Sequence, residues 1–427
     1  MTGTDDLGGV PPERHRSVEL FAGGGGMALG LRLAGFGHDA LVELNHNATR
    51  VLAHNAAAHP ALWEVGAVQR RDVAEWASSG DSDTSVRLVA GVPPCQPFSL
   101  SGAHAGHSDQ RNAFPAGLDV VRKLDPELVV FENVPGLTRP SFAPYFEYVK
   151  AQMACPSVLP VEGELWHEHA RRVGLGGPTA DRYAVYEQHV DAADLGVAQS
   201  RRRVFLIAVR NDLPGSADWA GLTTTHSRDA LLYDQYVEDA YWGGHGLPQP
   251  TTPDSLRPAI EGLKRAGRPS GERWRTLRDL LRDVPGPVDG QDHPTLTEHA
   301  GIPGARSYAK HTGSEYDWPS KTIKAGVHGI AGGEGMIRYA DGRLRYLTVR
   351  EAALVQGFPR DYGMPGVRSR VMGVIGNAVA VPVARRLGEV LSTAFLVQCL
   401  SISWRLDRGR RGRGGPWPGS RRRWRSR

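Results

Sequence analysis

The chain has 427 residues, of which 40% are hydrophobic, so it is long enough for two or three domains and a sizeable core. We find no apolar run of about 18 residues and no apolar signal core near the N-terminus, so we expect neither a membrane span nor secretion. Its three cysteines, Cys95, Cys155 and Cys399, lack metal-ligand spacing. This pattern excludes a disulfide scaffold and favours a reducing compartment, the cytoplasm.

The net charge of +5 is unevenly distributed along the chain. Residues 405–427 contain ten arginines and one aspartate, a charge of +9, which leaves −4 for the rest of the chain. A Gly/Arg-rich end of this kind buries little apolar surface, so we predict that it is disordered. It either adds nonspecific affinity for nucleic acid or is a solvated appendage without a role.

Short apolar runs alternate with helical patterns along the first 210 residues. A strand is predicted at Val18–Phe21, followed by a glycine turn and a helix that closes at Gly35. Four further runs predict strands within residues 39–45, 86–92, 127–133 and 203–209. The runs are apolar on both faces, as in a parallel sheet covered by helices on each side. The predicted fold class is therefore a doubly wound α/β fold.

The regular pattern stops after Arg210 and returns near residue 345. Residues 211–320 are rich in Pro, Gly, Thr and Asp, and within them residues 257–282 carry eight Lys/Arg against three Asp/Glu. Thr348 followed by Glu351 predicts a capping box, and residues 381–397 predict a final amphipathic helix. A variable module is thus inserted between the last sheet strand and two closing helices.

The glycine turn "LFAGGGGMALG" is placed where a ligand approaches a helix N-terminus. Glu43 ends the second predicted strand, where an acid can bind ribose hydroxyls. Asp72 is expected to end a further strand and to accept from an adenine amino group. Together they outline a nucleoside pocket, which fits a nicotinamide dinucleotide and S-adenosylmethionine equally well.

Three further features follow predicted strand ends or precede a strand. Cys95 stands in "GVPPCQPFSLSG", a stiff proline-flanked turn, although a buried cysteine is usually inert packing. Glu132, in "VVFENVPGL", lies close to Cys95 if their strands are neighbours, and a thiolate beside an acid suits addition–elimination chemistry. Arg201 and Arg203, in "QSRRRVFLIAVR", project to one side if extended and suit a phosphate, a carboxylate or a base carbonyl.

In this order, these segments resemble the DNA cytosine-5 methyltransferases. "LFAGGGG", "GVPPCQPFSLSG", "FENVPGL", "QSRRRVFLIAVR", "RYLTVREAALVQGFP" and "IGNAVAVPVARRL" match the family's motifs and cover most of residues 17–397. Glu19 stands where the family often has aspartate. The resemblance implies a Rossmann-like methyltransferase domain at 17–210 and 321–398, an inserted target-recognition domain at 211–320, an N-terminal extension at 1–16 and a basic tail at 399–427.

The resemblance also implies a reaction: methyl transfer from S-adenosylmethionine to carbon 5 of a cytosine within a specific duplex DNA sequence, on a flipped-out base. Cys95 would attack carbon 6, Glu132 would hold the amino group and ring nitrogen 3, and Arg201 or Arg203 would bind the cytosine O2. The cofactor residues implied are Phe21, Gly23, Gly25, Glu43, Asp72 and Asn377. No metal is expected.

The expected partner is duplex DNA, with phosphate contacts from residues 257–282, together with a possible cognate restriction endonuclease. The chain is expected to be a monomer that acts at the bacterial nucleoid. Alternatives are a cytosine-5 methyltransferase acting on transfer RNA, a nicotinamide-dependent oxidoreductase, and a non-catalytic DNA-binding protein.

Overall fold

The computed structural model of the chain describes residues 7–79, 85–94, 113–175, 182–307, 312–325 and 335–394. Cys95, the predicted nucleophile, and the basic tail lie outside these ranges. None of the helices within them has the length and apolar content that a membrane crossing requires.

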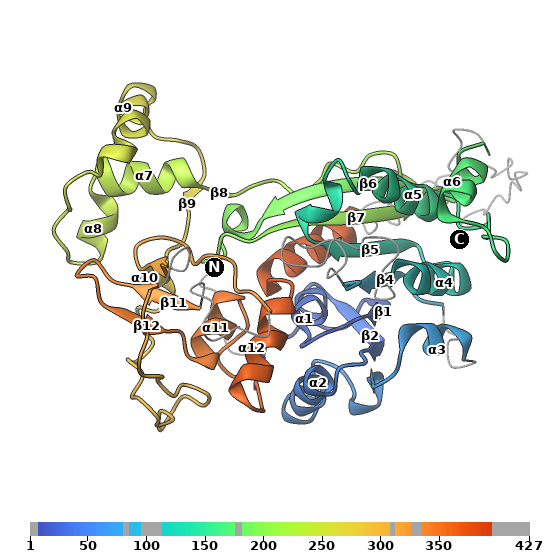
Figure 1. The fold of residues 1–427 in the computed structure, drawn as a ribbon, viewed down its shortest axis with the longest axis horizontal. Coiled ribbons are helices and arrows are strands. Elements are labelled where there is room, and N and C mark those ends of the chain that lie inside the picture. The colour runs from blue at the N-terminus through green and yellow to red at the C-terminus, as the bar shows by residue number, and fades with distance from the viewer. Residues whose placement is uncertain are drawn as a thin grey trace, which may run out of the picture.

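A seven-stranded sheet in the order β3-β2-β1-β4-β5-β7-β6 forms the centre of the molecule (Figure 1). The first five strands in this order are parallel, whereas β7 is antiparallel to β5 and to β6. The expectation of a parallel sheet is therefore correct for five strands and wrong for the strand at 203–209, and β6 was not expected at all. The bounds are β1 His15–Leu20, β2 Phe36–Val42, β3 Val68–Gln69, β4 Leu88–Gly91, β5 Leu128–Asn133, β6 Tyr183–Asp191 and β7 Arg202–Arg210.

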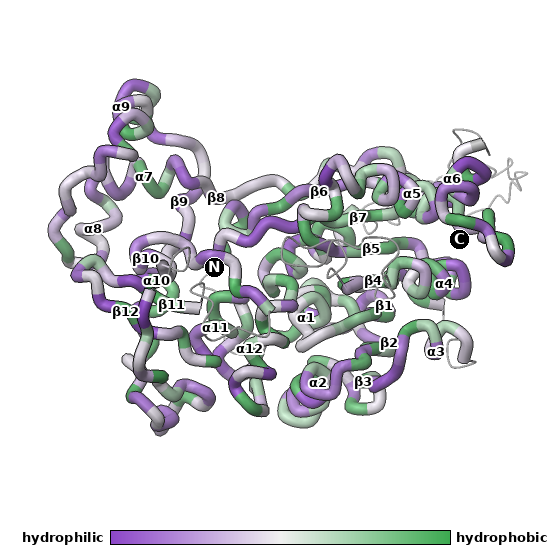
Figure 2. The backbone as a smooth tube through the Cα atoms, in the orientation of Figure 1, coloured by the Kyte–Doolittle hydropathy of each residue, from purple (hydrophilic) through white to green (hydrophobic). Residues whose placement is uncertain are grey.

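Both faces of the central strands are covered, as the apolar runs predict. Along β5, Val129 and Phe131 belong to the hydrophobic cluster on one face of the sheet. Leu128 and Val130 belong to the cluster on the other face. The first cluster includes side chains of α3, α4 and α5, and the second includes side chains of α1 and of the helix at 381–394. Figure 2 shows the resulting hydrophobic centre along β4, β5 and β7. Burial of these apolar runs fixes the sheet in the middle of the domain.

Some of the helices begin at a residue whose side chain caps the first turn. The Asn45 side chain accepts from the amides of Asn47 and Ala48 at the start of α2, and the predicted capping box of Thr348 and Glu351 is present at α11. The helices are α1 Gly26–Leu33, α2 His46–Ala58, α3 Val73–Ser78, α4 Phe114–Leu124, α5 Ala143–Ala154, α6 Trp166–Leu175, α7 Arg228–Tyr236, α8 Ala240–Gly244, α9 Arg257–Ala266, α10 Leu277–Leu280, α11 Val349–Val355 and α12 Arg368–Asn377, with 3₁₀ turns η1 Leu7–Gly9, η2 Val65–Ala67, η5 Pro135–Thr138, η6 Ala192–Leu195 and η7 Asp254–Leu256.

Helices α7, α8 and α9 belong to the predicted inserted module. Together they form a lobe beside the sheet, apart from the helices that cover the sheet (Figure 1). Its strands are β8 His226–Ser227 and β9 Glu272–Arg273, and a small sheet of β10 Ser314–Glu315, β11 Met336–Arg338 and β12 Leu344–Tyr346 adjoins it.

Both ends of the lobe meet the catalytic sheet at one place. The Thr225 amide donates to the carbonyl of Asp194 at 2.9 Å, and on the return the Ser320 amide donates to the carbonyl of Ala198 at 2.8 Å. The indole Nε1 of Trp274 donates to Asp194 Oδ1 at 2.9 Å. The lobe is thus attached to the sheet through residues 194–198.

Most of the basic side chains at 257–282 form ion pairs with acidic residues of the same chain. Five of the eight Lys/Arg side chains pair with carboxylates, among them Arg268 with Asp234 at 2.8 Å and Arg278 with Asp317 at 2.6 Å. The partners of Arg268 and Arg278 are distant in sequence, so these two side chains look more available for DNA in the sequence than they are in the fold.

Candidate active site

The predicted site residues converge on one edge of the sheet. Phe21 and Glu43 follow the carboxyl ends of β1 and β2, and Glu132 lies near the end of β5. Because β7 runs in the opposite direction, its first residues reach the same edge, where Glu132 pairs in register with Phe205. This brings Arg203 to the side of Glu132. Ligands of open α/β sheets bind at this edge.

The glycine turn has the unusual backbone that its sequence suggests. Phe21, Gly23 and Gly25 all adopt left-handed conformations, with φ of 54°, 57° and 85°. The Gly23 amide donates to Glu43 Oε2 at 2.8 Å, and the Asn45 amide donates to Glu43 Oε1 at 2.6 Å. Glu43 therefore joins the turn after β1 to the end of β2.

The turn is open on one side and closed on the other. A Cβ on Gly23 would meet no atom within 4 Å, whereas one on Gly25 would lie 2.6 Å from Tyr362 Oη. A Cβ on Gly26 would lie 2.3 Å from the carbonyl oxygen of Val379, so the segment after α12 packs against the start of α1. Asn377, the last residue of α12, is exposed beside this contact.

Glu19 is a further candidate site residue, to which the sequence analysis assigned no role. Its side chain is fully buried in β1, and neither carboxylate oxygen makes a well-formed hydrogen bond with the described residues, although the Ala28 amide at the start of α1 approaches it. Burial raises the pKa of Glu19 well above its ordinary value, and the charge of Glu43 adds to this rise. A buried acid so poorly satisfied is costly, which is the signal that points to a ligand nearby.

Asp72 corrects one expectation. Strand β3 ends at Gln69, and Asp72 does not end a strand but caps α3, with its Oδ1 accepting from the Ala74 amide at 2.8 Å. The physical reason is that an aspartate before a helix start satisfies an otherwise unpaired amide. Asp72 nevertheless follows shortly after β3, the strand that pairs with β2.

Glu132 and Arg203 form a buried ion pair. Arg203 Nε lies 2.7 Å from Glu132 Oε1, and the side chains are only 14% and 4% exposed. Burial raises the pKa of Glu132, although the charges of Arg203 and Arg201 oppose this rise. The carboxyl is therefore held in a setting where it takes up a proton more readily than a surface glutamate.

The described residues that lead to Cys95 lie next to the strand that carries Glu132. Strands β4 and β5 are parallel neighbours, and the Asn133 side-chain amide donates to the carbonyl of Pro93 at 3.2 Å. Cys95 follows two residues later, outside the described residues. The premise that the strands leading to Cys95 and Glu132 are neighbours is confirmed.

Arg201 and Arg203 differ in their surroundings. Arg201 is 2% exposed, and its guanidinium donates to two main-chain carbonyls, those of Ile323 at 3.2 Å and Gly376 at 2.9 Å. Arg203 instead faces Glu132. Of the two, Arg203 has the position suited to a substrate base.

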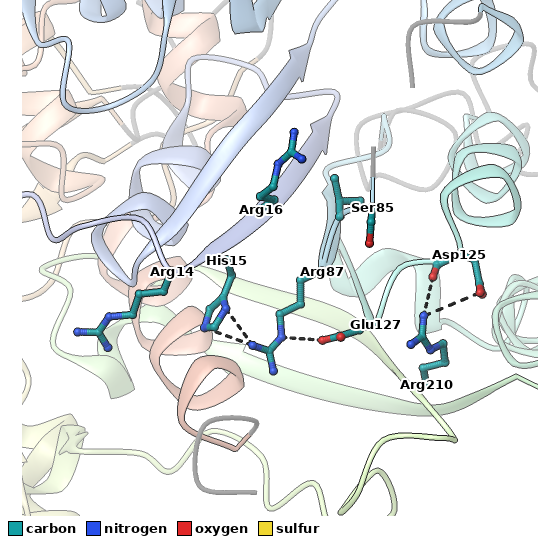
Figure 3. Close-up of a pocket in the computed structure, with 9 residues that line it drawn as sticks. Arg14, His15, Arg16, Ser85, Arg87, Asp125, Glu127 and Arg210 are labelled. Atoms are coloured by element: carbon teal, nitrogen blue, oxygen red, sulfur yellow. Dashed lines mark hydrogen bonds and ion pairs between the residues drawn. The ribbon is translucent and has the colours of Figure 1, made fainter. Parts of the chain in front are cut away.

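A polar pocket lies at the opposite edge of the sheet (Figure 3). It is lined by residues at the amino ends of β1, β4 and β5, and its charged side chains pair with one another: Arg87 lies 2.7 Å from Glu127, and Arg210 lies 3.8 Å from Asp125. None of the predicted site residues lines it, so it is not the candidate active site.

The sheet edge therefore defines a class of protein, a doubly wound α/β fold with a glycine turn and an acid at the ends of β1 and β2 and an acid–guanidinium pair at β5 and β7. The sequence profile of the C-5 cytosine-specific DNA methylases matches residues 15–154 and 179–393. The chain belongs to this family and is a DNA cytosine-5 methyltransferase.

Named relatives agree with this assignment. The chain is 28% identical over 381 residues to the Type II methyltransferase M.NgoMIV of Neisseria gonorrhoeae, covering 89% of this chain and 97% of that protein. It is 28% identical over 384 residues to the Type II methyltransferase M.Eco47II of Escherichia coli, covering 87% and 77%. These relatives and the family support DNA as the substrate, and the transfer RNA alternative has less support.

Solved structures share the fold. A putative DNA modification methyltransferase encoded within an E. coli prophage has a TM-score of 0.54 at 16% identity, covering 90% of this chain and 99% of that one. The S. pombe Dnmt2 methyltransferase has a TM-score of 0.51 at 17% identity, again covering 90% and 99%.

Proposed function

We propose that S-adenosylmethionine binds at the carboxyl ends of β1 and β2, beside Gly23, Glu43 and Glu19. This proposed site is called the cofactor cleft below. Three observations fit this cofactor: the open space above Gly23, the carboxylate of Glu43 and the poorly satisfied carboxyl of Glu19. The two oxygens of Glu43 accept from the amides of Gly23 and Asn45, and the carboxylate is proposed to accept also from a ribose hydroxyl.

Phe21, Gly25, Asp72 and Asn377 complete the proposed cofactor site. Phe21 and Gly25 shape the turn, Asp72 is proposed to accept from the adenine amino group, and Asn377 borders the start of α1. When bound, S-adenosylmethionine supplies an electrophilic methyl group on a sulfonium.

The proposed chemistry uses the other half of the sheet edge. The Cys95 thiolate forms a bond to carbon 6 of cytosine, and the electron pair of the C5–C6 double bond becomes available at carbon 5 for methyl transfer. Glu132 in its protonated form donates to ring nitrogen 3 and so neutralises the charge that develops during addition. Loss of the carbon-5 proton to a base and departure of the Cys95 thiolate restore the double bond.

Arg203 is proposed to bind the cytosine O2 and to keep Glu132 in place. Because the reacting carbon lies inside the duplex stack, the base has to be extruded, at a cost of about a few kcal/mol. The edge of the sheet between β5 and β7 is the proposed receiving pocket.

The observation that carries the proposal is the buried Glu132–Arg203 pair beside the anchored Pro93 turn. Its direct test is a duplex that contains 5-fluorocytosine, which cannot lose a proton from carbon 5. Incubation with S-adenosylmethionine is expected to leave a covalent adduct on the peptide that contains Cys95. Mass spectrometry that finds the adduct elsewhere, or none, rejects the mechanism.

The lobe that contains α7, α8 and α9 is proposed to read base edges in the DNA major groove, and so to define a specific site. A good bidentate contact discriminates by about 1–3 kcal/mol. A cognate restriction endonuclease is a further part of the proposal, which the Type II names of the bacterial relatives favour. A monomeric state and action at the bacterial nucleoid stay predictions. Methylome sequencing of a host without cytosine methylation, after expression of the chain, identifies the site.

A further inference from the structure

Three buried polar side chains connect the base pocket to the cofactor cleft. Gln199, Arg201 and Gln356 have exposed fractions of 0%, 2% and 0%. Gln199 and Arg201 precede β7, and Gln356 follows α11. Buried polar groups of this kind are costly unless they are paired, so their partners reveal what they hold.

Gln199 holds the segment that returns from the lobe. Its Oε1 accepts from the Ile323 amide at 3.0 Å, and its Nε2 donates to Gln356 Oε1 at 2.9 Å. The same Nε2 reaches the carbonyl of Val355 at 3.3 Å.

Gln356 continues the network toward the cofactor cleft. Its Nε2 donates to the carbonyl of Ile375 at 2.6 Å and to that of Ala378 at 3.3 Å. Residues 375–378 are the cofactor segment, since they contain Asn377 and pack against the start of α1.

Arg201 bridges the same two segments directly. Its Nη1 donates to the carbonyl of Ile323, and its Nη2 donates to the carbonyl of Gly376, the residue before Asn377. A small cavity is lined by Arg201, Arg203, Val379 and Ala380, so Arg203 lies close to the residues that directly follow the cofactor segment. Arg201 donates to the two carbonyls from two separate nitrogens of a planar fork, Nη1 and Nη2, whereas a lysine has a single nitrogen.

We infer that Arg201, with Gln199 and Gln356, is a positioning residue that holds the cofactor segment 375–378 in register with the base pocket. This inference rests on the proposed function of the two sites. It separates the paired arginines: Arg203 faces the substrate base, whereas Arg201 acts through the main chain of Gly376 and Ile323. If Arg201 instead bound the base, it would have no effect on cofactor binding in the absence of DNA.

The test is calorimetric titration of S-adenosylhomocysteine into the full chain without DNA. Arg201→Lys is expected to raise the Kd about tenfold, because one buried carbonyl loses its donor. Two matched controls, Arg203→Lys and Arg202→Lys, are expected to change it by less than about twofold. Arg202 lies between the other two arginines, and its side chain is 81% exposed.

A second variant keeps the inference testable if Arg201→Lys does not fold. Gln356→Met has similar length but donates to neither Ile375 nor Ala378, and it is expected to raise the same Kd and the KM for the cofactor while leaving the KM for DNA unchanged. Wild-type affinity in a folded Arg201→Lys or Gln356→Met variant overturns the inference alone. Failure of the wild-type chain to bind the ligand overturns the proposed cofactor site, and the inference with it.

Discussion

Arg203 Nε lies 2.7 Å from Glu132 Oε1, across the one junction where the sheet changes from parallel to antiparallel. The reversal is what allows a residue near the start of β7 to meet a residue near the end of β5. The acid and the guanidinium are therefore held by main-chain pairing between β5 and β7. Rigid strands are a better support for such a pair than a loop would be.

Replacement of this acid tests its place in the chemistry. Glu132→Gln is expected to lower the rate of methyl transfer by about 10²–10⁴-fold, since a proton donor to the base is weakened, with little change in cofactor affinity. Single-turnover transfer of a labelled methyl group and calorimetric titration measure the two effects. Glu127→Gln is the matched control, because Glu127 precedes the same strand and pairs with Arg87 at the opposite edge. Equal rates for the two variants would contradict the assignment.

The raised pKa of Glu132 also predicts a pH dependence of stability. The folded chain holds this proton at pH values where the unfolded chain has lost it, so the group contributes stability below its ordinary pKa of 4.5. That contribution is lost as pH rises through the raised pKa. We expect the free energy of unfolding of the wild type to fall relative to Glu132→Gln over this window. Urea unfolding at a series of pH values measures the difference, and a constant difference would refute it.

Two glycines of one turn are expected to respond differently to alanine. Gly25→Ala places a Cβ 2.6 Å from Tyr362 Oη and 2.8 Å from Leu52 Cδ2, so it should cost about 2–4 kcal/mol of stability through strain and overpacking. Gly23→Ala meets no neighbouring atom, so only its left-handed backbone costs stability, about 1–2 kcal/mol. Its methyl group projects into the proposed cofactor cleft, however.

Calorimetry and urea unfolding separate these two effects. Gly23→Ala is expected to weaken S-adenosylhomocysteine binding by more than about tenfold while it stays folded. An unchanged affinity in that variant would move the cofactor away from the turn.

The cysteine assignment has a control in the same chain. Cys95→Ser should abolish the adduct with 5-fluorocytosine DNA and keep cofactor affinity, because the hydroxyl is a far weaker nucleophile. Cys155→Ser should form the adduct normally, since Cys155 caps the end of α5. An adduct in the first variant, or its loss in the second, would reassign the nucleophile.

The sequence predicts the part of the site that depends on single strands. Glu43 and Glu132 directly follow or end apolar runs, and the glycine turn requires left-handed backbone, so the pattern of residues alone is enough to place all three at strand ends. The direction of β7 could not be predicted, because an apolar run buried on both faces has the same pattern in either direction. Strand β6 was missed because it is an edge strand with polar residues such as Glu187.

Long-range partners explain the remaining differences. The sequence presents Arg201 and Arg203 as equivalent, and their partners in the fold distinguish them: the carbonyls of Ile323 and Gly376 for Arg201, and Glu132 for Arg203. Arg268 and Arg278 likewise look free in the sequence, but acids on other elements of the fold pair with them.

The two attachment points of the lobe, at Asp194 and Ala198, have an evolutionary consequence. Because the lobe is attached at neighbouring residues, it can be exchanged for a lobe of another length without moving the strands that hold Glu132 and Arg203. Recombination between relatives that exchanges the lobe would then change the proposed DNA sequence preference in one genetic event, while the residues that carry out methyl transfer stay the same.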